Sequence, residues 1–145
     1  MALGAISFDI DGVLVDATRR LGACLNGSEV NWDCFLDCKK LALDAPKSRN
    51  IELARLLSER GYVVVIVTGR PEYMRECTEK QLGLYGVPHR GLYMRPVGDR
   101  RRDHLYKAEA ISALTGRLGL WAHFDDNIET VRALRALGID AVLAY

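Results

Sequence analysis

The stretch "AISFDIDGVLV", residues 5–15, places two carboxylates inside a run of apolar residues. The run has the composition of a buried strand, and "VVVIVT" at residues 63–68 is similarly apolar on both faces. Asp9 and Asp11 come at the end of the first run and, being two positions apart, lie on the same side of an extended chain. Like charges held close together repel, and removing them from water costs free energy. A divalent cation would offset that cost, so the pair indicates a metal-dependent site.

Strand-like and helix-like segments alternate along the chain. Strands are expected at residues 5–10, 63–68, 91–94, 121–124 and 140–145, and helices at 48–60, 71–82, 103–114 and 127–137, with a short helix within 31–44. This alternation predicts an α/β fold, a doubly wound, Rossmann-like parallel sheet of about five strands with helices on both faces. We expect a single domain over residues 1–145, with a small cap-like insertion at about 16–46.

A second acid pair, Asp125 and Asp126, follows the fourth predicted strand. In a doubly wound sheet, ligands bind outside the carboxyl ends of the strands, so we expect both acid pairs to share one site. We predict that Asp9, Asp11 and this second pair bind Mg²⁺, which prefers oxygen ligands and keeps substrate phosphate and water as its others. Alternatively, Asp126 or Asn127 caps the following helix, but a cap would leave Asp9 unexplained.

Three further residues are candidates for binding phosphate. The second strand ends in "VTGR", where Thr68 can give a hydroxyl to a phosphate oxygen and Gly69 lets the backbone come close. Lys107 comes at the start of a predicted helix, from which it could hold the carboxylates together and neutralise phosphate charge. Taken alone, Thr68 would be a β-branched residue before a turn, and Lys107 a solvated surface lysine.

Composition excludes several classes of protein. The 145 residues carry a net charge of +1, so bulk charge gives no case for a nucleic-acid or membrane partner. No apolar run reaches the roughly 18 residues that span a bilayer, and the N-terminus lacks a charged leader. The four cysteines lack the spacing of a disulfide framework and are predicted to be reduced thiols in a cytoplasmic protein. Cys34 and Cys38 lie one helical turn apart, but without a second nearby pair we favour apolar packing over zinc binding.

Four ordered motifs resemble those of the haloacid dehalogenase superfamily of phosphotransferases. Its D-x-D-G-[TV]-L motif matches "DIDGVL", and its apolar strand ending in Ser or Thr matches "VVIVTG". Its lysine is matched by Lys107 and its strand-terminal acid pair by "FDDN". Val13 stands where many members have Thr, which is an accepted variant. The resemblance spans essentially the whole chain and implies a minimal-cap phosphatase.

This resemblance implies roles for the acidic residues. Asp9 would be the nucleophile that forms an aspartyl-phosphate. Asp11 would be the general acid for the leaving group and then the base for water. Asp9, the backbone carbonyl of Asp11 and Asp125 would hold Mg²⁺, with Asp126 assisting. The candidate phosphate-binding residues would stabilise charge in the transition state.

The segment "LYMRPVGDRRRDHLYKAEAI", residues 92–111, is similar to the phosphatase domain of bifunctional polynucleotide kinase/phosphatases. That resemblance also extends to Arg20 and Arg70, which would contact substrate phosphate, and to Asp103, which would orient Lys107 or an arginine. Arginine binds phosphate through paired hydrogen bonds, and a basic loop suits a polyanionic strand end. The alternative is that the arginines at 100–102 form a solvated loop.

The preferred function is therefore a phosphomonoesterase, with a polynucleotide 3′-phosphate as the favoured substrate. A small phosphate ester such as a nucleotide is the alternative substrate. The sequence contains no G-x-x-x-x-G-K-[ST], so the kinase half of the bifunctional enzymes is not present in it. A non-enzymatic phospho-receiver domain is disfavoured because the third predicted strand, "GLYM", is not followed by an acid. The absence of G-x-G-x-x-G after the first strand counts against a dinucleotide-binding module.

Overall fold

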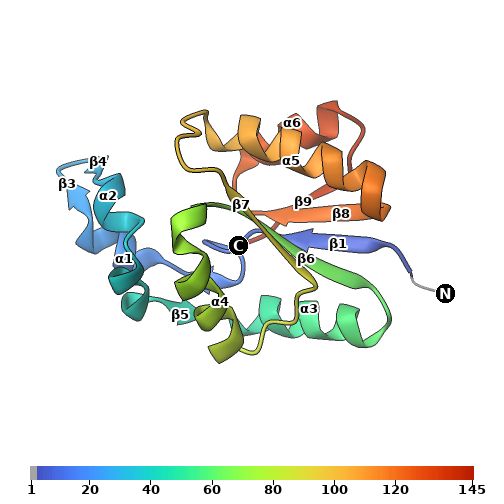
Figure 1. The fold of residues 1–145 in the computed structure, drawn as a ribbon, viewed down its shortest axis with the longest axis horizontal. Helices are drawn as coiled ribbons and strands as arrows, with labels where there is room; N and C mark the ends of the chain where they lie inside the picture. The colour runs from blue at the N-terminus through green and yellow to red at the C-terminus, as the bar shows by residue number, and fades with distance from the viewer. Residues whose placement is uncertain (1–2) are drawn as a thin grey trace.

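The computed structural model describes residues 3–145 and contains a central sheet of five parallel strands (Figure 1). These strands are β1 (Ala5–Phe8), β6 (Val63–Pro71), β7 (Gly91–Arg95), β8 (Leu120–Asp125) and β9 (Ala141–Leu143). Their spatial order is β7-β6-β1-β8-β9. The chain therefore adds β6 and β7 on one side of β1, then crosses over and adds β8 and β9 on the other side. The carboxyl ends of β1, β6 and β8 meet at this reversal, where doubly wound sheets bind ligands. The predicted α/β fold is confirmed.

Helices cover both faces of the sheet, as predicted (Figure 1). They are α3 (Ser48–Glu59) and α4 (Arg75–Leu84) on one face, and α5 (Asp103–Leu118) and α6 (Ile128–Ala136) on the other. The alternation within β6 explains this arrangement. Val64 and Ile66 pack into the core with α3 and α4, whereas Val65 and Val67 pack into the core with α5 and α6.

One predicted helix begins later than expected. Pro71 ends β6 instead of opening a helix, and a 3-10 turn, η2 (Glu72–Met74), precedes α4. The register between β6 and β7 shifts between Thr68 and Pro71, so the strand continues irregularly past its apolar run. This continuation places Gly69 and Arg70 in the strand rather than in a loop.

The segment from β2 to β5, residues 15–46, is here called the insertion, and Figure 1 shows it projecting from one end of the sheet. It contains β2 (Val15–Asp16), α1 (Thr18–Ala23), β3 (Leu25–Asn26), β4 (Glu29–Val30), α2 (Trp32–Phe35), η1 (Cys38–Leu43) and β5 (Ala45–Pro46). β2 and β5 pair antiparallel at its base. The helix expected within 31–44 is divided in two, because the Asp37 side chain accepts from the backbone N–H of Lys39 and starts η1 anew.

The prediction of reduced thiols is wrong, because the four cysteines form two disulfides. Cys24 pairs with Cys34 inside the insertion, and Cys38 pairs with Cys77 of α4 at a sequence separation of 39. The break between α2 and η1 turns Cys34 and Cys38 toward different partners, although their spacing fits one helical turn. No free cysteine remains among the described residues, which also leaves no thiolate for zinc.

No helix in the described part of the chain is long and apolar enough to cross a membrane.

Candidate active site

Three acidic side chains meet at the carboxyl ends of β1 and β8. Asp9 directly follows β1, Asp125 is the last residue of β8, and Asp126 comes next. Each offers a carboxylate oxygen that lies within 4.8 Å of those of the other two. Parallel pairing fixes this arrangement, since Phe8 is opposite Phe124 and the Asp9 backbone N–H donates to the Phe124 carbonyl at 2.9 Å. Asp9 of the first acid pair thus lies together with both residues of the second pair, whereas the Asp11 carboxylate is not part of this cluster.

The turn after β1 requires glycine at position 12. Gly12 has a φ of +88°, which disfavours any residue with a side chain. In addition, a Cβ at this position would lie 1.9 Å from Asp126 Oδ2. Lys47 supports the turn by donating to the Gly12 carbonyl at 3.1 Å. The D-x-D-G pattern therefore brings the backbone against the second acid pair.

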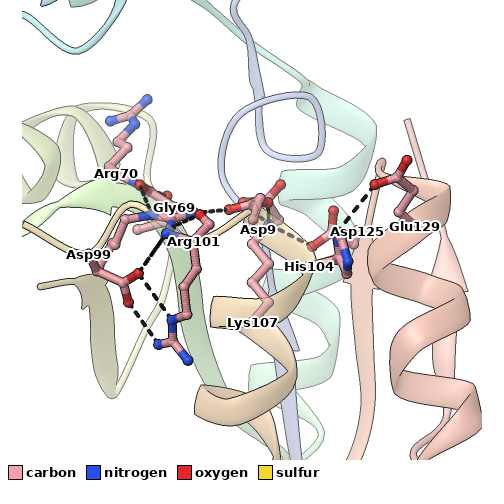
Figure 2. A network of polar contacts seen from close by, with 12 residues as sticks. Asp9, Gly69, Arg70, Asp99, Arg101, His104, Lys107, Asp125 and Glu129 are labelled. Atoms are coloured by element: carbon pink, nitrogen blue, oxygen red, sulfur yellow. Dashed lines mark hydrogen bonds and ion pairs between the residues drawn. The ribbon is translucent and has the colours of Figure 1, made fainter. Parts of the chain in front are cut away.

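Lys107 is the cation of this cluster, and Figure 2 shows it reaching from α5 toward Asp9 and Asp125. Its Nζ lies 2.7 Å from Asp125 Oδ2 and 3.1 Å from both Asp9 Oδ1 and Asp103 Oδ2. Burial alone would lower the pKa of Lys107, but the surrounding carboxylates, Asp9 first among them, raise it well above its usual value. Lys107 is thus a fully buried ammonium rather than a surface lysine.

Thr68 and Gly69 lie beside this cluster on β6. Thr68 is buried, and its hydroxyl oxygen accepts from the Arg70 backbone N–H at 3.1 Å. A Cβ on Gly69 would meet Asp103 Oδ1 at 2.4 Å, so a side chain at this position would have to displace the Asp103 carboxylate. Asp103 in turn contacts both Lys107 and Arg95, the latter at 2.8 Å. The sequence predicted contact with either Lys107 or an arginine, and Asp103 contacts both kinds of residue.

Arg20 and Arg70 bind the carboxylate of Asp11. Arg70 donates to it through Nε at 3.1 Å and Nη2 at 2.8 Å, and Arg20 Nη2 contacts the same group. Both arginine side chains are fully buried, whereas the Asp11 side chain is 22% exposed. Burial would raise the pKa of Asp11, but Arg70 and then Arg20 lower it to about 2. Arg20 and Arg70 thus contact protein carboxylates in this structure, and their contact with substrate phosphate stays a prediction.

The loop between β7 and α5 carries both paired and unpaired arginines. Arg101 is bound by Asp99 at 2.8 Å and by Glu109 at 2.7 Å, which Figure 2 shows for Asp99. Arg100 and Arg102 are exposed, and within residues 3–145 neither makes an ion pair. Only part of this basic stretch is thus neutralised within the molecule.

A family model described as the phosphatase domain of polynucleotide kinase PNKP matches residues 4–143. The chain belongs to this family. It is therefore a phosphatase domain of the haloacid dehalogenase type, a class of hydrolases that act on phosphoric monoesters. The four motifs and the basic segment at 92–111 all fall inside the matched range.

Solved structures with the same fold include other proteins besides polynucleotide repair enzymes. A chain of the Pnkp1/Rnl/Hen1 RNA repair complex superposes with a TM-score of 0.75 at 24% identity, covering 95% of this chain and 41% of that one. A class C acid phosphatase from Bacillus anthracis, with tungstate bound, gives 0.72 at 13% identity, covering 99% and 67%. A haloacid dehalogenase-like hydrolase from Streptococcus pneumoniae gives 0.69 at 16%, covering 96% and 83%. The present chain thus spans less than half the length of the repair protein it matches.

The acidic cluster of this PNKP-type phosphatase domain fits a divalent cation. Burial raises the pKa of Asp9 well above its ordinary value, and Asp125 adds to this effect while Lys107 opposes it. Burial and then Asp125 also raise the pKa of Asp126. Two of three adjacent carboxylates thus resist ionisation although Lys107 contacts Asp9, and their hard oxygen atoms are ligands of the kind that Mg²⁺ takes.

Ser7 and His123 support the site in a way the sequence analysis missed. His123 Nε2 lies 2.8 Å from Asp125 Oδ2, and its Nδ1 lies 2.7 Å from the Ser7 hydroxyl. Burial lowers the pKa of His123, so its ring is neutral. An ionised carboxylate can only accept, so Nε2 carries the proton and Nδ1 accepts from Ser7. The one signal in the sequence was that Ser7 and His123 are polar residues within the otherwise apolar strands β1 and β8.

Proposed function

We propose that this chain is a Mg²⁺-dependent phosphomonoesterase that works through an aspartyl-phosphate on Asp9. The observation that carries the proposal is the position of Asp9, whose carboxylate shares one site with those of Asp125 and Asp126 and contacts Lys107. Asp9, Asp125, Asp126 and the backbone carbonyl of Asp11 would hold the cation. When bound, Mg²⁺ would neutralise charge on the transferred phosphoryl group.

The proposed reaction has two displacements at phosphorus. In the first, an Asp9 carboxylate oxygen attacks phosphorus, the bond to the leaving oxygen breaks, and that oxygen takes a proton from Asp11. In the second, water attacks the phosphorus of the aspartyl-phosphate, gives a proton to Asp11, and the bond to Asp9 breaks. Thr68, the backbone at Gly69 and Lys107 would bind the phosphoryl oxygens throughout.

The arginine pair affects how Asp11 can act. With a pKa of about 2, Asp11 is ionised at neutral pH, so it is ready to orient water but rarely carries the proton that the first step needs. Poorly basic leaving groups, which depart without a proton, should therefore react fastest. We expect p-nitrophenyl phosphate to be hydrolysed faster than phenyl phosphate.

For the substrate we propose the 3′-phosphate of a nucleic-acid end. Three observations support this choice: the family, the likeness to a chain from an RNA repair complex, and the exposed Arg100 and Arg102 just before α5, which carries Lys107. A small phosphate ester such as a nucleotide is the second candidate, favoured by the similar TM-score of an acid phosphatase structure. The phospho-receiver alternative is not retained, since the chain belongs to a phosphatase family.

The test is a hydrolysis panel with Mg²⁺ and with EDTA. It compares a 3′-phosphorylated oligonucleotide, the same oligonucleotide with a 5′-phosphate, mononucleotides and sugar phosphates. We expect Mg²⁺-dependent phosphate release with a strong preference for the first substrate. Equal rates on all substrates would favour the small-ester alternative, and equal rates in EDTA would contradict the role of the metal.

A further inference from the structure

Asp44 is a buried carboxylate at the point where the insertion returns to the sheet, between η1 and β5. Its side chain has no exposed area, and it accepts from Arg20 Nε at 2.9 Å and from Arg20 Nη2 at 3.0 Å. Gln81 Nε2 donates to it at 2.8 Å, and Arg70 Nη2 lies 3.7 Å away. None of the sequence motifs points to this residue.

Asp44 and Asp11 share the same two arginines. Arg20 lies between them and contacts both through Nη2, while Arg70 binds Asp11 through two nitrogens and faces Asp44 through one. Two guanidinium groups and two carboxylates therefore alternate in one buried cluster with no net charge. Of the two carboxylates, only Asp11 reaches the surface of the site.

The insertion fixes the orientation of Arg20 by three contacts. Asp44 binds the Nε edge of the guanidinium in a bidentate manner, and the Phe35 carbonyl accepts from Nη1 at 3.0 Å. The Arg20 Cζ also stacks 4.3 Å from the centre of the Phe35 ring. Nη2 therefore has one hydrogen directed at Asp44 and its second free to reach Asp11.

Removal of the Asp44 charge would leave two buried cations facing one carboxylate. A buried charge without a partner is costly, so at least one arginine would have to move toward water or draw Asp11 with it. Either change would shift the Asp11 carboxylate relative to Asp9. Asp44 would thus act on the reaction without touching the substrate.

We propose that Asp44 is a positioning residue, which sets the orientation of Asp11 through Arg20 and Arg70. This inference rests on the proposed function, because it assigns Asp44 to the step in which Asp11 exchanges a proton. It also gives the insertion a role in catalysis, as the source of the group that holds Arg20.

The test is the variant Asp44→Asn, which keeps the shape of the side chain and removes its charge. We expect kcat on p-nitrophenyl phosphate to fall about 10- to 100-fold per folded molecule, with KM changed less than twofold. In an Asp11→Asn background the same substitution should have almost no further effect. Ile139→Ala, a buried cavity variant in the turn before β9, controls for lost stability and should keep the wild-type kcat per folded molecule.

Crystal structures of wild type and of Asp44→Asn separate this proposal from the proposed function. We expect at least one of the two arginines to have moved away from Asp11 in the variant. The proposal is overturned if kcat stays within twofold of wild type, if the loss persists in the Asp11→Asn background, or if Asp11 keeps both arginines in the variant crystal. If wild type hydrolyses no phosphate ester, the proposed function fails, and the crystal comparison alone then decides the role of Asp44.

Discussion

At the scale of single residues, Asp9 is held by contacts from three directions. Its carboxylate accepts from the Ile10 backbone N–H at 2.8 Å and lies 3.1 Å from Lys107 Nζ. Its own backbone N–H donates to the Phe124 carbonyl of β8. The side chain is therefore fixed at the centre of the acidic cluster, and a substitution there should change chemistry without changing the fold.

We expect Asp9→Asn to lower kcat by about 10³-fold or more, because the amide cannot form the acyl-phosphate bond. Stability should be retained, since the buried carboxylate is already disfavoured as an anion. Phosphate release and circular dichroism check the two halves of this prediction. Asp140→Asn, an exposed carboxylate on the loop before β9, is the control with the same change in composition. Turnover by Asp9→Asn close to wild type would remove Asp9 from the nucleophilic role.

Asp126 offers a test of the metal site that does not need activity. Its pKa is raised in the folded protein, so its ionised form destabilises the metal-free fold above that pKa and has no effect below the unfolded pKa. We expect Asp126→Asn to raise the Tm of the metal-free protein at neutral pH, with the gain vanishing near about pH 3. The rise in Tm on adding Mg²⁺ should shrink in the same variant.

Thermal unfolding with and without Mg²⁺ measures both effects, with Asp140→Asn again as the control. A lower metal-free Tm, together with an undiminished Mg²⁺ effect, would show that Asp126 is not among the ligands.

At the scale of elements, the arginines in and beside the loop between β7 and α5 fall into two groups. Arg95 and Arg101 are committed to carboxylates of the protein, which leaves Arg100 and Arg102 exposed beside the start of the helix that carries Lys107. If the substrate is the proposed nucleic-acid 3′-end, these two side chains would contact phosphates next to the one being removed.

We expect the double variant Arg100→Ala/Arg102→Ala to lower kcat/KM for a 3′-phosphorylated oligonucleotide while leaving p-nitrophenyl phosphate unaffected. The slope of log(kcat/KM) against log[salt] should become shallower by about 0.7 for each single-strand phosphate that the variant no longer binds. Steady-state kinetics from low to high salt measures this slope. Arg132→Ala, an exposed arginine on α6, is the matched control. An equal loss on both substrates would argue that the loop supports the site instead of binding the strand.

The regular elements were largely predictable because their signals are local. Short apolar runs indicated all five strands, and amphipathic spacing or signals at the helix ends indicated the four large helices. The insertion was not predictable in detail, since its strands have only two residues each and its helices are short. Such elements are stabilised by their contacts and caps rather than by propensity.

At the scale of the whole molecule, the Cys38–Cys77 disulfide joins the insertion to α4. A cross-link over 39 positions should stabilise the fold by about 4 kcal/mol through the entropy of the unfolded chain. We expect Cys38→Ser/Cys77→Ser to lower Tm by about 10 °C and a reductant to lower the Tm of wild type. Calorimetry with and without dithiothreitol measures this, with thiol titration of the native protein as the control. A Tm insensitive to reductant, or four titratable thiols, would contradict the pairing.

Some residues of the candidate site could likewise be predicted from local sequence motifs, whereas others depend on contacts between distant parts of the chain. Asp9, Thr68 and Asp125 follow from motifs at strand ends, which parallel pairing brings together, and Lys107 follows from a motif near the start of α5. Asp44 could not be predicted, because its importance comes from two arginines that lie 24 and 26 positions away on different elements. Pairing of the cysteines was missed for the same reason, since the helix that seemed to hold two of them breaks between them.

The central position of β1 has a consequence for local motion. All four of its residues are buried, and it is hydrogen-bonded on both sides, to β6 and to β8. Backbone amides in such a strand are expected to exchange with deuterium only when the whole molecule opens, whereas the exposed outer part of the insertion, at β3 and β4, should open at small free energies. Asp9, the proposed nucleophile, directly follows this strand, so we expect its location to persist at temperatures where the outer part of the insertion has already begun to exchange.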